Sequence, residues 1–137
     1  RAVRAGMPCF AECGGYMYLS EAFYDKTVCL PMVGVVPGKV RMTDRLTRFG
    51  YITLTAEKDT FLCKKGDTVR AHEFHYSDST ENGSAFTARK AGGKRFWPAV
   101  YAEGNILAGY PHIHFCGTPG WAENFVNACA RWRSGGK

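Results

Sequence analysis

The 137-residue sequence predicts an α/β protein, and three observations carry this prediction. A short apolar segment near the start of the chain is followed by two glycines and a helical stretch. Strand-like segments occupy the middle of the sequence, and an amphipathic helix closes it. The length corresponds to one domain of ordinary size. The sequence contains no repeat, low-complexity tract or linker that would divide it.

The first expected element is a buried parallel strand. Residues 1–6 read as the end of a helix, and residues 7–12 are mostly apolar, as in strands that are buried on both faces. The next three residues, Cys13, Gly14 and Gly15, predict a sharp turn, because glycine accepts backbone angles that strain other residues. A helix is then expected over residues 16–24.

The middle of the chain predicts strands joined by short loops. Four segments read as strands: 32–37, 50–56, 68–76 and 85–89. Two segments read as loops by composition: 81–84 and 90–94. Residues 103–105 (Glu-Gly-Asn) predict a hairpin turn between strands at 99–102 and 106–109, and another extended segment is expected over 112–116.

The closing helix has the clearest signals. Thr118 can cap it, and Pro119 fits the first helical position, where its missing N–H is harmless. Large apolar residues recur at helical spacing: Trp121, Phe125, Cys129 and Trp132. We expect this face to pack on the core rather than to bind a cofactor.

Charge and hydropathy exclude several classes of protein. The formal net charge is +6, but the basic residues are scattered and form no dense run, so we expect no nucleic-acid partner. A mildly basic face suits an acidic substrate or a partner domain equally well. No segment approaches the roughly 18 apolar residues of a membrane span, and no signal peptide is visible. We therefore expect a cytoplasmic protein without a membrane partner.

The six cysteines read as reduced thiols, because the apolar content makes disulfide staples unnecessary and no secretion signal is present. Cys13 stands out among them. Ala11 and Gly15 supply small residues on both sides of it, as in a nucleophile elbow between a strand and a helix. The following helix would favour the thiolate, and the N–H of Gly14 would face a developing oxyanion. A buried turn cysteine remains the alternative for this motif alone.

A cysteine nucleophile needs a base, and the four histidines occur in two pairs: His72 with His75, and His112 with His114. On a strand, His112 and His114 would share one face. An imidazole within hydrogen-bond reach of the thiol takes its proton and later returns it to the leaving group. A zinc site is the rival interpretation of these cysteines and histidines. Tight Cys-x2-Cys pairing is absent, so we expect no metal.

Around Cys13 and the two histidine pairs, the sequence resembles a known family. Residues 5–19 resemble the nucleophile segment of cobyrinic acid a,c-diamide synthases. Further segments resemble the same family in the same order: 32–38, 41–43, 49–51, the signature 72–77 (His-Glu-Phe-His-Tyr-Ser) and the histidine motif 110–115 (Tyr-Pro-His-Ile-His-Phe). The ordered matches span nearly the whole chain.

The resemblance implies a class I, triad-type glutamine amidotransferase domain of the cobyric-acid-synthase-like branch, with a flavodoxin-like mixed sheet and flanking helices. Residues 1–137 would be an incomplete domain, truncated at its N-terminus, with its leading strands and the ATP-dependent synthetase domain absent. ATP and Mg²⁺ would bind that synthetase domain, and no cofactor would bind this fragment. Isolated, the fragment would be inactive and would associate with itself or be somewhat distorted.

The implied function is the glutaminase portion of a ligase, a cobyrinate or hydrogenobyrinate a,c-diamide synthase of cobalamin biosynthesis. Its partners would be glutamine, the synthetase domain of the same protein and, through that domain, the corrinoid precursor. Two alternatives stay open. The chain is a degenerate glutaminase fold that only docks a partner, or it serves a synthase of a related tetrapyrrole such as nickel-sirohydrochlorin.

The resemblance also implies roles for individual residues. Cys13 would be the nucleophile, His112 the general base and acid, and Gly14 an oxyanion donor. Many triad amidotransferases place a Glu two residues after the catalytic His, and His114 occupies that position in this sequence. His114 would orient His112 or simply pack.

Three residues of the 72–77 signature, His72, Glu73 and His75, would line the glutamine pocket, face the synthetase domain or serve a structural strand. Three positions depart from the family pattern: Ala71 stands for a usual Gly, and Gly109 and Pro111 stand for a usual Ser and an aliphatic residue. The last two changes would shift the loop that carries His112.

Overall fold

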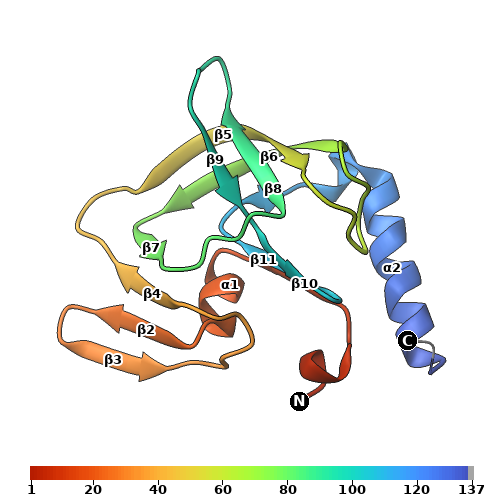
Figure 1. Ribbon diagram of the computed structural model, residues 1–137. Helices are drawn as coiled ribbons and strands as arrows, with labels where there is room; N and C mark the ends of the chain where they lie inside the picture. The colour runs from red at the N-terminus through yellow and green to blue at the C-terminus, as the bar shows by residue number, and fades with distance from the viewer. Residues whose placement is uncertain (136–137) are drawn as a thin grey trace.

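The computed structural model describes residues 1–135. Its strands form three sheets, with one short and one long α-helix beside them (Figure 1). The α/β class with mixed strand pairing, predicted from the sequence, is confirmed. Parallel pairs are few, because most of the strands meet as antiparallel neighbours.

The smallest sheet joins the two ends of the chain. β1 (Cys9–Glu12) pairs in parallel with β11 (Ile106–Gly109), which pairs antiparallel with β10 (Tyr101–Glu103). The 3-10 turn η1 (Val3–Ala5) precedes β1, and helix α1 (Gly14–Leu19) follows it. The predicted hairpin is confirmed as β10 and β11. The expected parallel strand is confirmed as β1, although its residues are only half-buried.

The largest sheet has five antiparallel strands. Their order is β12 (His112–Ile113), β6 (Thr68–His75), β5 (Arg48–Ala56), β8 (Phe86–Lys90) and β9 (Phe96–Ala99). Exposed and buried residues alternate along β5 and β6, as expected where one face packs on a core and the other does not. The predicted strands at 50–56, 68–76 and 85–89 are therefore confirmed within one or two residues.

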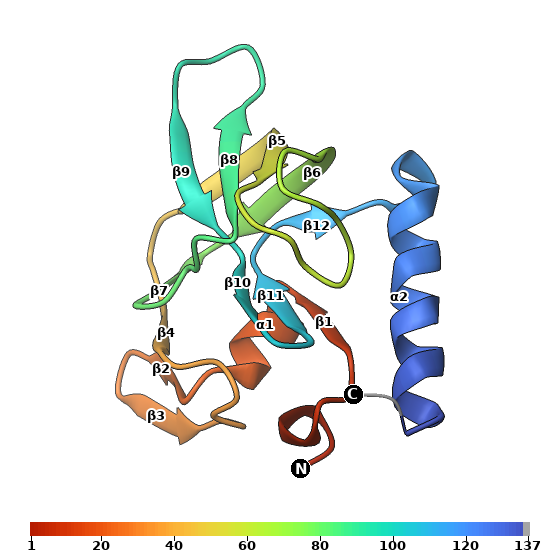
Figure 2. The same ribbon diagram turned by 45° about the vertical axis from the view of Figure 1, so that its right-hand side comes forward.

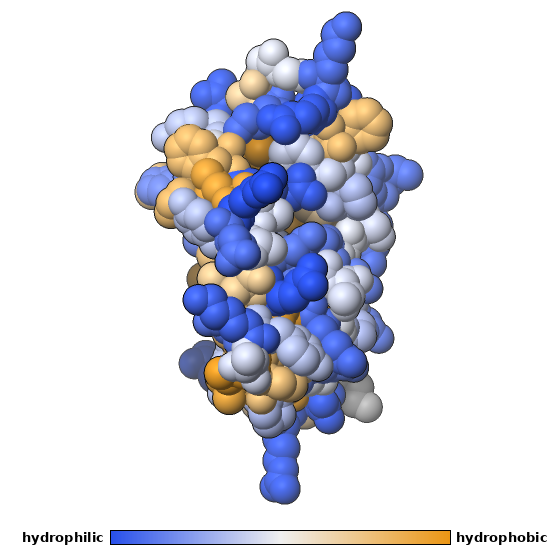
Figure 3. Space-filling view, turned by 90° about the vertical axis from the view of Figure 1, so that its left-hand side faces the viewer, coloured by the Kyte–Doolittle hydropathy of each residue, from blue (hydrophilic) through white to orange (hydrophobic). Residues whose placement is uncertain are grey.

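The third sheet is one that the sequence did not predict. Its four strands are β3 (Val28–Pro31), β2 (Ala22–Asp25), β4 (Lys39–Met42) and β7 (Ser77–Ser79). Figure 3 shows the side of the molecule that carries this sheet, where small apolar patches alternate with hydrophilic surface. Two of the exposed apolar side chains, Val28 and Leu30, belong to β3.

Two expectations for residues 16–37 are wrong. The helix ends at Leu19 instead of continuing to residue 24, because Ser20 is extended and its hydroxyl donates to the carbonyl of Met17 at 2.7 Å. Residues 32–37 form an irregular loop instead of a strand. Their N–H groups bond to carbonyls at the end of α1: Val33 to Tyr18 at 3.1 Å, and Val35 and Val36 to Leu19 at 2.9 Å. Carbonyls at a helix end lack intrahelical partners, so the loop satisfies them.

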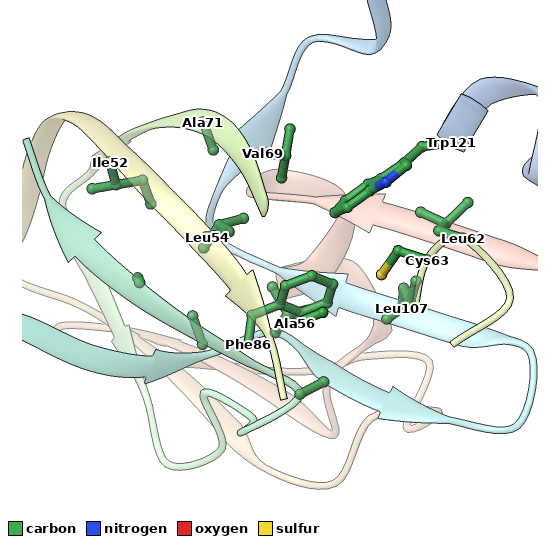
Figure 4. Packing of buried hydrophobic residues seen from close by; sticks show 14 residues of the cluster. Ile52, Leu54, Ala56, Leu62, Cys63, Val69, Ala71, Phe86, Leu107 and Trp121 are labelled. Atoms are coloured by element: carbon green, nitrogen blue, oxygen red, sulfur yellow. The ribbon is translucent and has the colours of Figure 1, made fainter. Parts of the chain in front are cut away.

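The main core lies between the five-stranded sheet, β11 and the closing helix α2 (Pro119–Arg133). Phe86, Leu54, Leu62 and Leu107 are almost fully buried in it, and Trp121 inserts from α2 (Figure 4). The helix begins at Pro119 as the sequence predicts, although Thr118 makes no side-chain capping bond. Figure 2 shows α2 standing beside the sheets, linked to β12 through the short 3-10 turn η2 (Phe115–Gly117).

A second, smaller core supports the strand–turn–helix at Cys13. Tyr16 and Val36 are fully buried, and Leu19, Ala108 and Tyr110 pack with them. The rings of Tyr16 and Tyr110 meet edge to face, with centroids 5.1 Å apart. This cluster packs α1 against β11, so the segments that carry Cys13 and His112 are supported by the same packed core. In the described chain, 1–135, neither α-helix is both long and apolar enough to cross a bilayer.

Candidate active site

Cys13 sits on a strained turn between β1 and α1. Its φ of 47° and ψ of −107° lie outside the common regions for a residue with a side chain. Its N–H donates to the carbonyl of Gly109 at 2.8 Å, which continues the β1–β11 ladder by one residue. Strain of this kind concentrates at functional sites, where surrounding structure holds it in place. The elbow predicted from the sequence is therefore present.

The electrostatics of the Cys13 thiol differ from the expectation. Partial burial raises the pKa of the thiol, the N–H of Gly14 lowers it, and the nearby carboxylate of Glu12 raises it further. The upward effects prevail, because burial is the largest of the three. The thiol is therefore protonated at neutral pH, and formation of the thiolate requires a base.

The segment that carries His112 lies near the elbow because β11 pairs with β1. The chain leaves β11 at Gly109, opposite Glu12 in the register, and arrives at β12 after Tyr110 and Pro111. There His112 pairs with His72 at the edge of the five-stranded sheet. Topology thus brings the segment of His112 to the segment of Cys13, although the two are far apart in the sequence.

Glu12, the residue before Cys13, contacts the His112 segment directly. Its Oε1 accepts a 2.6 Å hydrogen bond from the N–H of Ile113, and its Oε2 lies 3.7 Å from His112 Nδ1. No sequence pattern indicates this contact, since Glu12 and Ile113 are 101 positions apart. Within residues 1–135 no hydrogen bond joins the Cys13 thiol to the His112 imidazole. Catalytic hydrogen bonds often form only once substrate is bound.

His112 and His114 open onto a groove on the outer face of the five-stranded sheet. The groove has a volume of about 540 Å³, and its lining includes Tyr51, Thr53, Arg70, His72, His112 and His114. His114 does not continue the strand, because β12 ends at Ile113 and His114 becomes the N-cap of η2. The expected extended segment is therefore shorter than 112–116. His72 stands in the groove between the rings of Tyr51 and Phe49, which it meets edge to face.

Glu73 and His75 do not lie in this groove. Glu73 is buried, 2% exposed, and burial raises the pKa of its carboxyl against the opposing effect of Arg48. The buried ring of His75 donates from Nδ1 to the carbonyl of Ser77 at 2.8 Å. It stacks on Tyr110 with centroids 3.7 Å apart. Tyr110 leads into the His112 segment, so His75 packs against the residue that begins this segment. This contact fits the structural role that was one of the alternatives for His75.

The structure gives a reason for the glycine at position 109, where a Ser is usual in the family pattern. A Cβ at this position would lie 3.1 Å from the Cα of Val100 and 3.3 Å from the Cδ of Pro111. Those contacts are tight, so a glycine at 109 and a proline at 111 fit together. No group of three or more His, Cys, Asp or Glu side chains in residues 1–135 is arranged to hold a metal ion.

Comparison with known families gives one match over most of the chain. The model of the CobB/CobQ-like glutamine amidotransferase domain matches residues 1–119. This span includes the elbow at Cys13, the carboxylate of Glu12 and both histidines of the 112–114 segment.

Comparison with curated proteins finds cobyrinate a,c-diamide synthases. That of Listeria monocytogenes serotype 4b is 43% identical over 114 residues, which cover 80% of this chain and 25% of the relative. The synthase of Priestia megaterium is 37% identical over 93% of this chain and 28% of its own length. The synthase of Salmonella typhimurium is 37% identical over 95% of this chain and 29% of its own length. The chain thus spans under a third of these relatives.

Proposed function

The chain belongs to the CobB/CobQ-like glutamine amidotransferase family, and on that premise we propose that it hydrolyses glutamine as the glutaminase portion of a cobyrinate a,c-diamide synthase. One observation carries the proposal: a cysteine on a positive-φ elbow, beside a segment that presents a histidine and is tied to the elbow by hydrogen bonds. The names of the relatives indicate the overall reaction. The cysteine and histidine of the site fit the glutaminase step of such a reaction.

In the proposed reaction, His112 takes the proton of the Cys13 thiol, and the sulfur attacks the side-chain amide carbon of glutamine. The carbonyl oxygen gains negative charge, which the N–H of Gly14 stabilises as a hydrogen-bond donor. His112 then returns the proton to the leaving nitrogen, so that ammonia departs and a thioester forms. Water, deprotonated by His112, attacks the thioester and releases glutamate, which restores the thiol.

In the proposed full-length protein this chain is part of a glutaminase domain that delivers ammonia to a synthetase domain. That domain would use ATP and Mg²⁺ to activate the a and c acetate groups of a cobyrinate or hydrogenobyrinate precursor. The relatives' greater length, of which this chain covers 25 to 29%, supports the presence of a partner domain.

The test is replacement of Cys13 by alanine in the full-length protein. We expect glutamine-dependent amidation to fall by about 1,000-fold or more, because the nucleophile is lost. Amidation with added ammonia should persist, since it bypasses the glutaminase. His112→Ala should behave in the same way, and His114→Ala should be milder. Cys29→Ala is the matched control, because Cys29 is an exposed thiol on β3, away from the elbow.

A second candidate, a docking module without glutaminase activity, is favoured by the raised pKa of the Cys13 thiol and by the absence of a thiol–imidazole hydrogen bond in residues 1–135. The same assay separates the two functions. A full-length protein that uses ammonia but not glutamine, before any substitution, would support the docking module. Retention of glutamine-dependent activity by the Cys13→Ala variant would contradict the proposed nucleophile.

A further inference from the structure

The carboxylate of Glu12 faces the His112 segment at two points, and one of them is a hydrogen bond. One oxygen accepts a hydrogen bond from the N–H of Ile113 at 2.6 Å, which is short for an N–H···O bond. The other oxygen faces His112 Nδ1 at 3.7 Å. A single carboxylate therefore contacts both the backbone and the ring of the segment that carries the proposed base.

The position of Glu12 is fixed more firmly than that of an ordinary surface carboxylate. It is the last residue of β1, opposite Gly109 in the parallel register, and it is followed at once by the strained Cys13. Its side chain is only 26% exposed, against 44% for His112. Partial burial and a fixed backbone reduce the entropy that a flexible side chain would lose in holding one geometry.

We propose that Glu12 is the positioning carboxylate of His112, and this inference rests on the proposed glutaminase function. Many triad amidotransferases supply this carboxylate from two residues after the histidine. In this chain that residue is His114, which occupies the N-cap position of η2 and lines the groove. The carboxylate comes instead from the other side of the site, from the residue before the nucleophile. The strand pairing that forms the elbow thus also delivers the acid.

The chemical consequence concerns which nitrogen of His112 carries the proton. With Nδ1–H directed at the carboxylate, Nε2 keeps its lone pair and serves as the base toward the thiol. The carboxylate also stabilises the imidazolium that forms when the thiol is deprotonated. The Ile113 bond limits movement of the ring by fixing the backbone beside it. Loss of the charge should therefore slow chemistry more than it weakens glutamine binding.

The test is Glu12→Gln in the full-length protein. The amide oxygen of Gln can still accept the Ile113 N–H, so the substitution removes the charge and keeps the backbone contact. We expect kcat for glutamine hydrolysis to fall by about 10- to 100-fold. KM for glutamine should stay within about twofold, and ammonia-dependent amidation should be unchanged. Glu12→Asp should restore part of kcat, because it returns the charge on a shorter side chain.

Glu123→Gln on α2 is the matched control, since Glu123 is exposed and its replacement should leave all rates unchanged. Long-range ¹H–¹⁵N spectra of the His112 ring give a second readout that a merely structural role would not produce. The wild type should show the Nδ1–H form, and Glu12→Gln should gain the Nε2–H form. Wild-type kcat in Glu12→Gln would overturn the positioning role alone, provided that Cys13→Ala is inactive. Glutamine-dependent activity in Cys13→Ala would overturn the proposed function itself.

Discussion

At the scale of single residues, Cys13 combines a strained backbone with a protonated thiol. Only two other residues of 1–135 that are not glycine have positive φ, Lys26 and Val100. The hydrogen bond from the Cys13 N–H to Gly109 keeps the elbow in this conformation. The raised pKa of the thiol means that reactivity is not a resting property of the residue. In the proposed mechanism, reactivity arises when the base and the substrate are both in place.

Alkylation by iodoacetamide tests this electrostatic account. Because burial and Glu12 raise the pKa of the Cys13 thiol, less thiolate is present near neutral pH than in a free cysteine. Alkylation of Cys13 at about pH 7.5 should therefore be slower than alkylation of N-acetylcysteine, and its rate should keep rising above about pH 9. Glu12→Gln should speed alkylation although it slows glutamine hydrolysis. Mass spectrometry of the Cys13 peptide measures the rate.

Equal alkylation rates for Cys13 and N-acetylcysteine at neutral pH would contradict the raised pKa of the thiol. Glu123→Gln serves again as the control, because it removes one carboxylate far from the elbow. Slower alkylation in Glu12→Gln than in the wild type would show that the Glu12 carboxylate lowers the pKa of the thiol instead of raising it.

At the scale of secondary-structure elements, periodicity predicted β5, β6, β8, the β10–β11 hairpin and α2. It missed the four-stranded sheet for two reasons. All four residues of β3 are exposed, so its sequence shows no alternation of buried and exposed positions. In addition, β4 pairs with β7, which is distant in the sequence. Of the site, Cys13 and the histidines follow from sequence, but the contact of Glu12 with Ile113 depends on tertiary folding. No local sequence pattern predicts a contact between residues so far apart in the chain.

The glycine at position 83 tests how tightly the elements are packed. A Cβ there would lie 2.1 Å from the backbone of Val100 and Tyr101, at the isolated bridge that precedes β10. Gly83→Ala should therefore lower the free energy of unfolding by about 3 kcal/mol or more, because the backbone must move. Thermal unfolding followed by circular dichroism measures the loss.

Gly92→Ala is the matched control for that substitution. Gly92 also has positive φ, 65°, but a Cβ there would meet nothing within 4 Å. It should cost only about 1 to 2 kcal/mol, the strain of a left-handed alanine. Equal losses in the two variants would show that backbone strain, and not the close approach to Val100, governs position 83.

At the scale of the whole molecule, Tyr110 connects the smaller core with the five-stranded sheet. This residue packs with Tyr16 in the smaller core and stacks on His75 of the five-stranded sheet. Burial lowers the pKa of His75, against the effect of the Ser77 carbonyl. A lowered folded-state pKa means that the unfolded chain binds the proton more readily. His75 therefore favours folding above its unfolded pKa of about 6.5, and this contribution is lost as pH falls.

Replacing His75 by phenylalanine should reduce the acid sensitivity of the protein. The phenyl ring can stack on Tyr110 but cannot take up a proton. Between about pH 7.5 and 5.5, the wild type should lose free energy of unfolding faster than the variant, by up to about 1.4 kcal/mol per pH unit. Urea unfolding at each pH measures this. The comparison uses the slope of unfolding free energy against pH. Loss of the Ser77 hydrogen bond lowers the stability of the variant at every pH and leaves this slope unchanged. Titration of Glu73 affects both proteins equally. Parallel slopes would contradict the assignment.

The pairing of β1 with β11 also determines when the proposed site first exists during folding. Glu12 and Ile113 lie 101 positions apart, so the contact between them closes a long loop. Contacts across long loops form slowly, because the intervening chain must first lose conformational entropy. Cys13 therefore meets the proposed base, His112, only after β1 and β11 have paired. Under the proposed function, a partly folded molecule therefore carries an inert thiol and consumes no glutamine.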